Sequence, residues 1–377
     1  MTAATAQDAL NLIPTRGNLP WLKDRTILLV QRGSRAYGTH RLDSDFDYGG
    51  ICITPRYIRD GFLHQFEQAE FKPVLGESTF DGSIFSLQKF FKLAASATPN
   101  ALELLWTEDR LLCTKAGQML VAHRKLFLSQ KVLHTFRGYA MAQLRRVRSH
   151  RRWLLEPPPG PPDRAAYGLP PRTAIPADQL DAAQSCIQKK MDSWEIDFGA
   201  MEKADVIYIQ EQIKKHLAEM SVGVEEKAIA AGRLLGYEDN FLLYLDRERK
   251  YKQAKTEWKQ YQTWKSERNP ARAKMEATFG YDGKHALHLV RLMRMCREIL
   301  TSGIVNVFRQ DAEELKGLLV GSWTFDALMS WAEAQDRELP ILAKESPLPK
   351  EPNRRELDNL CIRIQHDTLD AWDTQEF

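Results

Sequence analysis

The sequence predicts an α/β (α+β) fold, in which a small domain built on a short mixed sheet precedes a mainly α-helical C-terminal domain. Three observations carry this prediction. Short β-branched and aromatic runs cluster in the first 90 residues, nearly everything after Thr135 has helical spacing, and one proline-rich segment, 156–171, interrupts the helical half. The expected domains are 1–128 and 129–377.

Three segments of the first domain are predicted to be strands. Residues 26–30 (TILLV) form an apolar run that is too short for a helix and is soon followed by Gly33. Residues 46–54 and 79–87 are β-branched or aromatic runs bounded by glycine, proline or charge. The first domain therefore has at least three strands.

Helical spacing begins where the third predicted strand ends. Apolar residues recur at helical intervals from Leu87, and Pro99 is expected to end that helix. Asn100, with Glu103 three residues later, is a predicted capping pair for the next helix.

Composition limits the class of protein. With 377 residues, 43% of them hydrophobic, the chain is long enough for two domains that each bury a core. The net charge of +3 is too small to argue for nucleic-acid binding by itself. No stretch approaches the roughly 20 apolar residues that a membrane span needs, and the N-terminus lacks a signal-peptide pattern, so we expect a cytoplasmic protein with no membrane association.

The cysteines show neither C-x-x-C pairs nor zinc-site spacing with histidine. We expect reduced, buried thiols at Cys52, Cys113, Cys186, Cys296 and Cys361.

A carboxylate motif follows the first predicted strand. It has the form G-S-x10-D-x-D, with Gly33, Ser34, Asp45 and Asp47 at its fixed positions. Side chains at i and i+2 of a strand point the same way, so the two aspartates project together. Gly33 lets the backbone approach a phosphate, and Ser34 offers a hydroxyl and an N–H at a helix start. This arrangement suits nucleotidyl transfer, which needs carboxylates around two divalent ions.

Asp81 is the candidate third carboxylate. It would complete the set if its strand lies beside the strand of Asp45 and Asp47, and it could act as base toward an attacking hydroxyl. The alternatives are an ordinary polar turn and a calcium loop. The calcium loop fits poorly, because Tyr48 and Thr54 stand where it needs glycine and glutamate.

A second set of candidates lies in the helix predicted after Asp282, its expected N-cap. Lys284, His288 and Arg291 are spaced i, i+4 and i+7 and form one stripe that could hold a triphosphate. The alternative is an ordinary amphipathic helix with solvated basic residues.

Arginines are concentrated in residues 143–153 (QLRRVRSHRRW). Arg145, Arg148 and Arg152 lie on one helical face and are candidates for contact with an RNA acceptor. Structural salt bridging is the alternative.

These motifs resemble polymerase-β-superfamily nucleotidyltransferases, and in particular the polymerase-β-like nucleotidyltransferases associated with RNA repair in bacteria and phages. The resemblance starts at GSRAYGTHRLDSDFDYGGI (33–51), D-x-S-x-x-S-L-x-K-F (81–90) and PNALELLW (99–106). It continues at HRRWL (150–154), YGLP (167–170) and GYDGKHALHLVRL (280–292).

The resemblance implies a palm-like sheet that carries Asp45, Asp47 and Asp81 as catalytic residues and metal ligands. The implied cofactor is a pair of Mg²⁺ ions, or Mn²⁺ in their place, with a nucleoside triphosphate as donor. The acceptor implied is an RNA (tRNA-like) end, with functional association with an RNA ligase or repair proteins. The nucleotide-binding residues would be Gly33, Ser34, Arg35, Tyr37, Lys284, His288 and Arg291.

Two other functions remain open from the sequence. The same carboxylates would serve transfer of a nucleoside monophosphate to a small molecule or a protein. A non-catalytic RNA- or nucleotide-binding module is a third reading, and the intact Asp45, Asp47 and Asp81 argue against it. The sequence does not select the nucleotide, because base selection depends on pocket shape.

Overall fold

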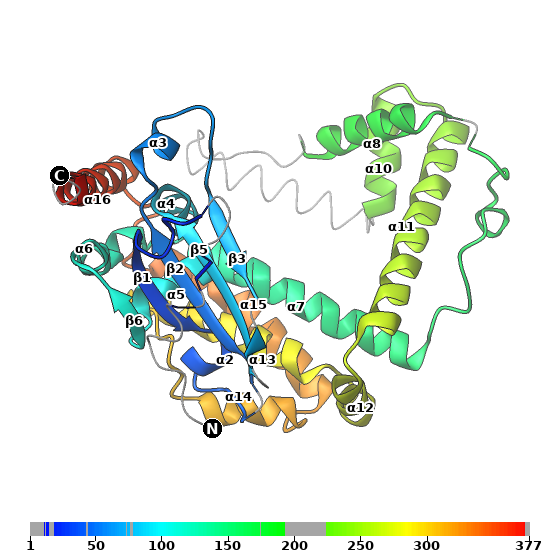
Figure 1. The fold of residues 1–377 in the computed structure, drawn as a ribbon. Coiled ribbons are helices and arrows are strands. Elements are labelled where there is room, and N and C mark those ends of the chain that lie inside the picture. The colour runs from blue at the N-terminus through cyan, green and yellow to red at the C-terminus, as the bar shows by residue number, and fades with distance from the viewer. Residues whose placement is uncertain are drawn as a thin grey trace. The chain divides into compact units, whose positions relative to one another are not determined.

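The computed structural model describes residues 11, 13–14, 19–42, 44–72, 74–75, 78–173, 175–192 and 224–373. The chain forms two compact units, one of Met1–Leu155 with Pro270–Phe377 and one of Glu156–Asn269 (Figure 1). The predicted boundary between residues 128 and 129 lies inside the first unit. Asp43, which would open the alternative calcium loop, lies outside the described residues.

The first unit is built on a mixed sheet with strand order β3-β5-β2-β1-β6, and β4 pairs with β5. Strands β2 and β5 are parallel, whereas the other pairs are antiparallel, which confirms the predicted mixed sheet. The bounds are β1 Thr26–Arg32, β2 Phe46–Cys52, β3 Gln68–Phe71, β4 Val74–Leu75, β5 Ser78–Ser86 and β6 Arg110–Cys113.

The three predicted strands correspond to β1, β2 and β5, with ends shifted by one or two residues. Strands β3, β4 and β6 are shorter and were not predicted, because two to four residues give too little alternation to recognise. Along β1, Leu28 and Val30 enter one core, while Leu29 between them enters the core on the other face.

Helices of the first unit lie between the strands and after them along the chain. They are α2 Gly33–Ala36, α3 Arg56–Arg59, α4 Leu87–Ala95, α5 Pro99–Trp106, α6 Lys115–Ala122, η1 Arg124–Phe127, α7 Val132–Leu155, α12 Pro270–Phe279, α13 Gly283–Ser302, α14 Ala312–Leu319, α15 Phe325–Glu345 and α16 Arg354–Asp373.

The predicted capping pair at the start of α5 is wrong. The helix begins at Pro99 with Thr98 as its N-cap, so Asn100 already lies within the helix. Proline is well suited to the first helical position, because its missing N–H would have no intrahelical partner there. Glu103 is buried and makes other contacts, described below.

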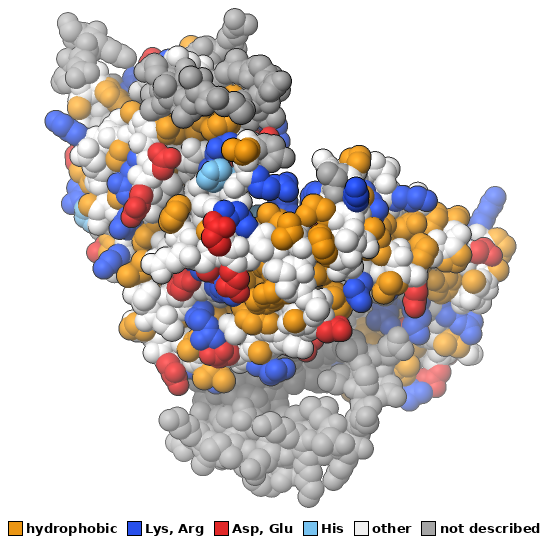
Figure 2. Space-filling view, turned by 90° about the horizontal axis from the view of Figure 1, so that it is seen from below, with side chains coloured by type: hydrophobic (Ala, Val, Ile, Leu, Met, Phe, Trp, Pro, Cys, Tyr) orange, Lys and Arg blue, Asp and Glu red, His pale blue; other side chains and the backbone are white. Residues whose placement is uncertain are grey.

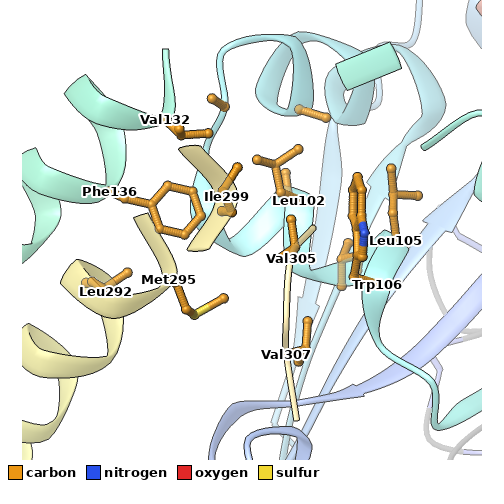
Figure 3. Close-up of a cluster of buried hydrophobic side chains, with 14 of the residues drawn as sticks. Leu102, Leu105, Trp106, Val132, Phe136, Leu292, Met295, Ile299, Val305 and Val307 are labelled. Carbon is orange, nitrogen blue, oxygen red and sulfur yellow. The ribbon is translucent and has the colours of Figure 1, made fainter. Parts of the chain in front are cut away.

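The main core joins α5, α7 and α13. In Figure 3, the Phe136 ring of α7 lies beside Ile299 of α13 and below Val132 of its own helix, and Leu102 of α5 lies on the far side of Ile299. Full burial of such a side chain stabilises the fold by about 1.5–3 kcal/mol. This packing holds α13 in place beside the sheet.

The second unit has a smaller core of its own, made by Leu180, Ala183, Ile187, Ala231, Leu242 and Leu245. Its described elements are η2 Ala165–Tyr167, α8 Ala177–Asp192, α10 Val224–Leu234 and α11 Asp239–Glu267. The proline-rich segment is attached to α11, because the Arg164 guanidinium pairs with the buried Glu248 carboxylate.

All five cysteines are free thiols. The prediction that they are buried holds for Cys52, Cys296 and Cys361, but Cys186 is exposed and Cys113 is partly exposed. Cys186 lies on the solvent-exposed face of helix α8. Among the described residues, no helix is both long and apolar enough to cross a membrane.

Candidate active site

Two of the predicted catalytic carboxylates are neighbours on adjacent strands. Asp47 of β2 is the register partner of Asp81 of β5, and because the strands are parallel both side chains project from the same face of the sheet. Asp45 lies two residues before Asp47, just outside β2. Asp47 is half-buried, whereas Asp45 is exposed and the Asp81 side chain is 49% exposed. The three carboxylates therefore form one solvent-accessible group.

Gly33 makes room for this group. It lies at the junction of β1 and α2 with a φ of +64°, in the left-handed region. A Cβ at this position would lie 1.9 Å from Asp47 Oδ2. Only glycine allows the turn to come this close to the carboxylate.

We expect Gly33→Ala to lower both stability and activity. The left-handed conformation costs a non-glycine residue about 1–2 kcal/mol, and the new methyl group would push the Asp47 carboxylate out of place. Urea unfolding and nucleotide transfer assays measure the two losses. Gly160→Ala is a suitable control, because a Cβ there meets nothing within 4 Å. Full activity of Gly33→Ala would contradict the close approach.

The negative charges of the three carboxylates are only partly balanced by nearby positive charges. The pKa of Asp47 is raised, chiefly by burial and further by the negative charges of Asp81 and Asp45. Arg32 and Lys284 act in the opposite direction. The remaining repulsion among the carboxylates favours a bound cation.

The Lys72 ammonium group lies beside the carboxylates, where a bound cation would also be favoured. Lys72 Nζ lies 3.1 Å from Asp81 Oδ2, with side-chain exposures of 68% and 49%. An ion pair this exposed contributes at most about 1 kcal/mol, so a divalent ion can replace it. The oxygen-only ligand set also suits Mg²⁺ or Mn²⁺. The site therefore fits a divalent cation.

Sequence reasoning missed Arg32 and Lys72. Arg32 is the register partner of Asp47 across β1 and donates a hydrogen bond to Ser83 Oγ (2.8 Å). Its position directly before the Gly33 motif was an available signal. No such sequence signal pointed to Lys72, because only strand pairing brings Lys72 close to Asp81.

Arg35 holds the segment that carries Asp45. Its guanidinium donates hydrogen bonds to the carbonyl oxygens of Asp45 (3.2 Å) and Ser44 (2.8 Å) and lies 3.8 Å from the Phe46 ring centroid. These contacts hold residues 44–46, just before and at the start of β2, against α2. The predicted role of Arg35 in nucleotide binding stays a prediction.

Two other predicted nucleotide-binding residues lie in a buried network. The Tyr37 hydroxyl donates to Glu103 Oε2 (2.6 Å), and Arg291 donates to Glu103 Oε1 (2.6 Å). The Arg291 guanidinium lies 3.8 Å from the Tyr37 ring centroid. Burial raises the pKa of the Tyr37 hydroxyl. The network links the end of α2 to α13.

The start of α13 places one predicted basic residue toward the carboxylates. As predicted, Asp282 is the N-cap, and its Oδ1 accepts from the backbone N–H groups of Lys284 (2.8 Å) and His285 (3.2 Å). Lys284 is exposed, and its charge lowers the pKa of Asp47. Burial, together with nearby Arg291 and Lys284, lowers the pKa of His288 to about 3, so its imidazole is neutral.

The three arginines of α7 that are candidates for RNA contact are all exposed: Arg145, Arg148 and Arg152. Arg148 also contacts α15, where it donates to Glu333 Oε1 (2.7 Å) and to Met329 Sδ (3.4 Å). In Figure 2, basic side chains are interspersed with acidic and hydrophobic ones on the face shown. Any contact with a polyanion therefore depends on local arginines rather than on the net charge.

Comparison with known proteins finds a matching family model and a phage relative. The model of a family described as "RlaP: RNA repair pathway DNA polymerase beta family" matches residues 3–154. An uncharacterized 38.9 kDa protein of Enterobacteria phage T4, from the nrdC-mobD intergenic region, is 33% identical over 92 residues. That match covers 23% of this chain and 27% of the phage protein. No solved structure matches the chain.

Proposed function

We propose that this chain is a metal-dependent nucleotidyltransferase, because the model of the RNA repair pathway DNA polymerase beta family matches residues 3–154. It would move a nucleoside monophosphate from a nucleoside triphosphate to a hydroxyl at an RNA (tRNA-like) end and release pyrophosphate. The pairing of Asp47 with Asp81, with Asp45 two residues away, is the observation that carries this proposal.

The three carboxylates would hold Mg²⁺, or Mn²⁺ in its place. When bound, the metal would neutralise the triphosphate and lower the pKa of the acceptor hydroxyl. The raised pKa of Asp47 and the Lys72–Asp81 ion pair both support a cation here. Lys72 would turn toward solvent when the substrate binds.

The chain's own groups would then position the reactants. Gly33 lets the backbone approach a phosphate, and Ser34 offers its hydroxyl at the start of α2. Lys284 would stabilise the charge that develops on the leaving pyrophosphate. Asp81 would accept the proton of the attacking hydroxyl as the new bond to the α-phosphorus forms and the bond to the bridging oxygen breaks.

An RNA acceptor is favoured over a small molecule by the family and by the exposed arginines of α7. Arg145 and Arg152 are seven residues apart on that helix and so lie on one side of it. Each phosphate they contact would steepen the salt dependence of binding. Arg148 would need to leave Glu333 to take part.

The test is transfer of α-³²P-labelled ATP, GTP, CTP and UTP to total RNA in the presence of magnesium. We expect label in RNA with the intact protein and none with the Asp45→Asn/Asp47→Asn double variant. Transfer would fall as salt rises, because RNA binding depends on released counterions.

Label that appears in RNA equally with the double variant would refute the assignment of the carboxylates. If the intact, folded protein left RNA unlabelled but labelled a small molecule or a protein, the RNA acceptor would be wrong and the nucleotidyltransferase assignment would stand. Binding of nucleotide or RNA with no transfer to any acceptor would instead support a non-catalytic module.

A further inference from the structure

We propose that His150, Asp282 and His285 form a second metal site, which takes a transition-metal ion of the zinc class and is distinct from the catalytic carboxylates. Each residue offers one ligand atom, and these atoms all lie within 4.8 Å of one another. His285 Nε2 is 3.9 Å from Asp282 Oδ2. Ligand atoms at the usual zinc bond lengths lie about 3.4 Å apart in a tetrahedral site, so side-chain rotations that bring these three atoms closer together would complete the site.

The hydrogen-bond partners of the Nδ1 atoms of both histidines favour metal binding through Nε2. His150 Nδ1 lies 3.1 Å from Glu276 Oε1, and His285 Nδ1 lies 2.7 Å from Gln143 Oε1. An oxygen acceptor at Nδ1 holds the proton there and leaves the Nε2 lone pair for a ligand bond. Carboxylate and amide oxygens behind metal-bound histidines play this role in known sites. Glu276 is only 2% exposed, so its carboxylate is held in place.

Asp282 supplies a negatively charged ligand to the site. Asp282 Oδ2 accepts a hydrogen bond from Arg272 at 2.5 Å, while Asp282 Oδ1 caps α13. The Arg272 side chain is 42% exposed and can turn into solvent when a metal ion takes its place. The cap is kept, because it uses the other carboxylate oxygen.

Ligand chemistry separates this site from the catalytic one. Two imidazole nitrogens and one carboxylate oxygen suit Zn²⁺, Co²⁺ or Ni²⁺, whereas Mg²⁺ prefers oxygen ligands only. An open fourth position would be taken by water.

The position of the site indicates a structural role near the active site. His150 lies in the last turns of α7, before the inserted unit 156–269, and Asp282 and His285 follow that unit. A bound ion would therefore join the two segments between which the unit is inserted. It would also fix the first turn of α13, from which Lys284 acts on Asp47.

The experiment uses the full chain, stripped of metal with EDTA and titrated with Zn²⁺ by calorimetry and with Co²⁺ by visible absorption. We expect one site per chain and the absorption bands of Co²⁺ with nitrogen and oxygen ligands. His150→Ala and His285→Ala would each weaken binding at least about 100-fold, and Glu276→Gln would weaken it about 10–100-fold without removing a ligand.

Two controls make the result decisive. His134→Ala removes an exposed histidine of the same helix α7 and should leave Zn²⁺ binding unchanged. The Asp45→Asn/Asp47→Asn double variant should also bind Zn²⁺ normally, so failure of the proposed function would not remove this site. Circular dichroism would confirm that each variant is folded. Zn²⁺ binding that survives in folded His150→Ala and His285→Ala, or no binding by the intact protein, would overturn the proposal.

Discussion

Asp47→Asn is expected to reduce nucleotide transfer at least about 10²–10³-fold, the range for removing one group that stabilises a transition state. It should do so without loss of stability. The pKa of Asp47 is raised in the folded chain, mainly by burial. Folding therefore disfavours the charged carboxylate, and asparagine removes that penalty while keeping the shape beside Gly33.

The effect of Asp47→Asn on stability should depend on pH. A carboxyl group with a raised pKa in the folded state lowers stability as pH rises from its ordinary pKa of 3.8 through the raised value. In EDTA, Asp47→Asn should therefore gain stability relative to the intact protein above about pH 4, and the two should converge below it.

Urea unfolding at several pH values, with transfer assays in parallel, measures both effects. Asp109→Asn is the matched control, because Asp109 is exposed and lies outside the carboxylate group. Strong destabilisation by Asp47→Asn at neutral pH would show that this carboxylate is structural rather than part of an active site.

Glu103→Ala is expected to lower the free energy of unfolding by about 3–5 kcal/mol, the cost of leaving one partner of a buried ion pair alone. Glu103 accepts hydrogen bonds from both Arg291 and Tyr37, and all three residues are buried. Tyr37→Phe removes one neutral donor and should cost less, about 1–3 kcal/mol.

The double variant Glu103→Leu/Arg291→Met separates charge from packing. It removes both charges and should recover much of the stability that Glu103→Ala loses. Glu333→Ala is the control for an exposed pair, because Arg148 and Glu333 are both about half exposed, and it should cost at most about 1 kcal/mol. Urea unfolding measures all four variants. A loss below 1 kcal/mol for Glu103→Ala would contradict the network's structural role.

Residues whose position depends on local backbone geometry could be predicted from the sequence. The G-S-x10-D-x-D spacing placed Asp45 and Asp47 at one strand end, because side-chain direction in a strand depends only on local geometry. The Asp282 cap at the start of α13 was predictable for the same reason, since a cap bonds to N–H groups two and three residues ahead.

The sequence by itself therefore determined the mixed sheet, the three main strands and the carboxylate motif. Only the tertiary structure decided which residue of the Lys284, His288 and Arg291 stripe remains exposed, because helical spacing defines a common side but not what packs against it. It also decided that Lys72 meets Asp81 and that His150 meets His285. Such pairs depend on strand pairing and helix packing between segments distant in sequence, which local periodicity does not record.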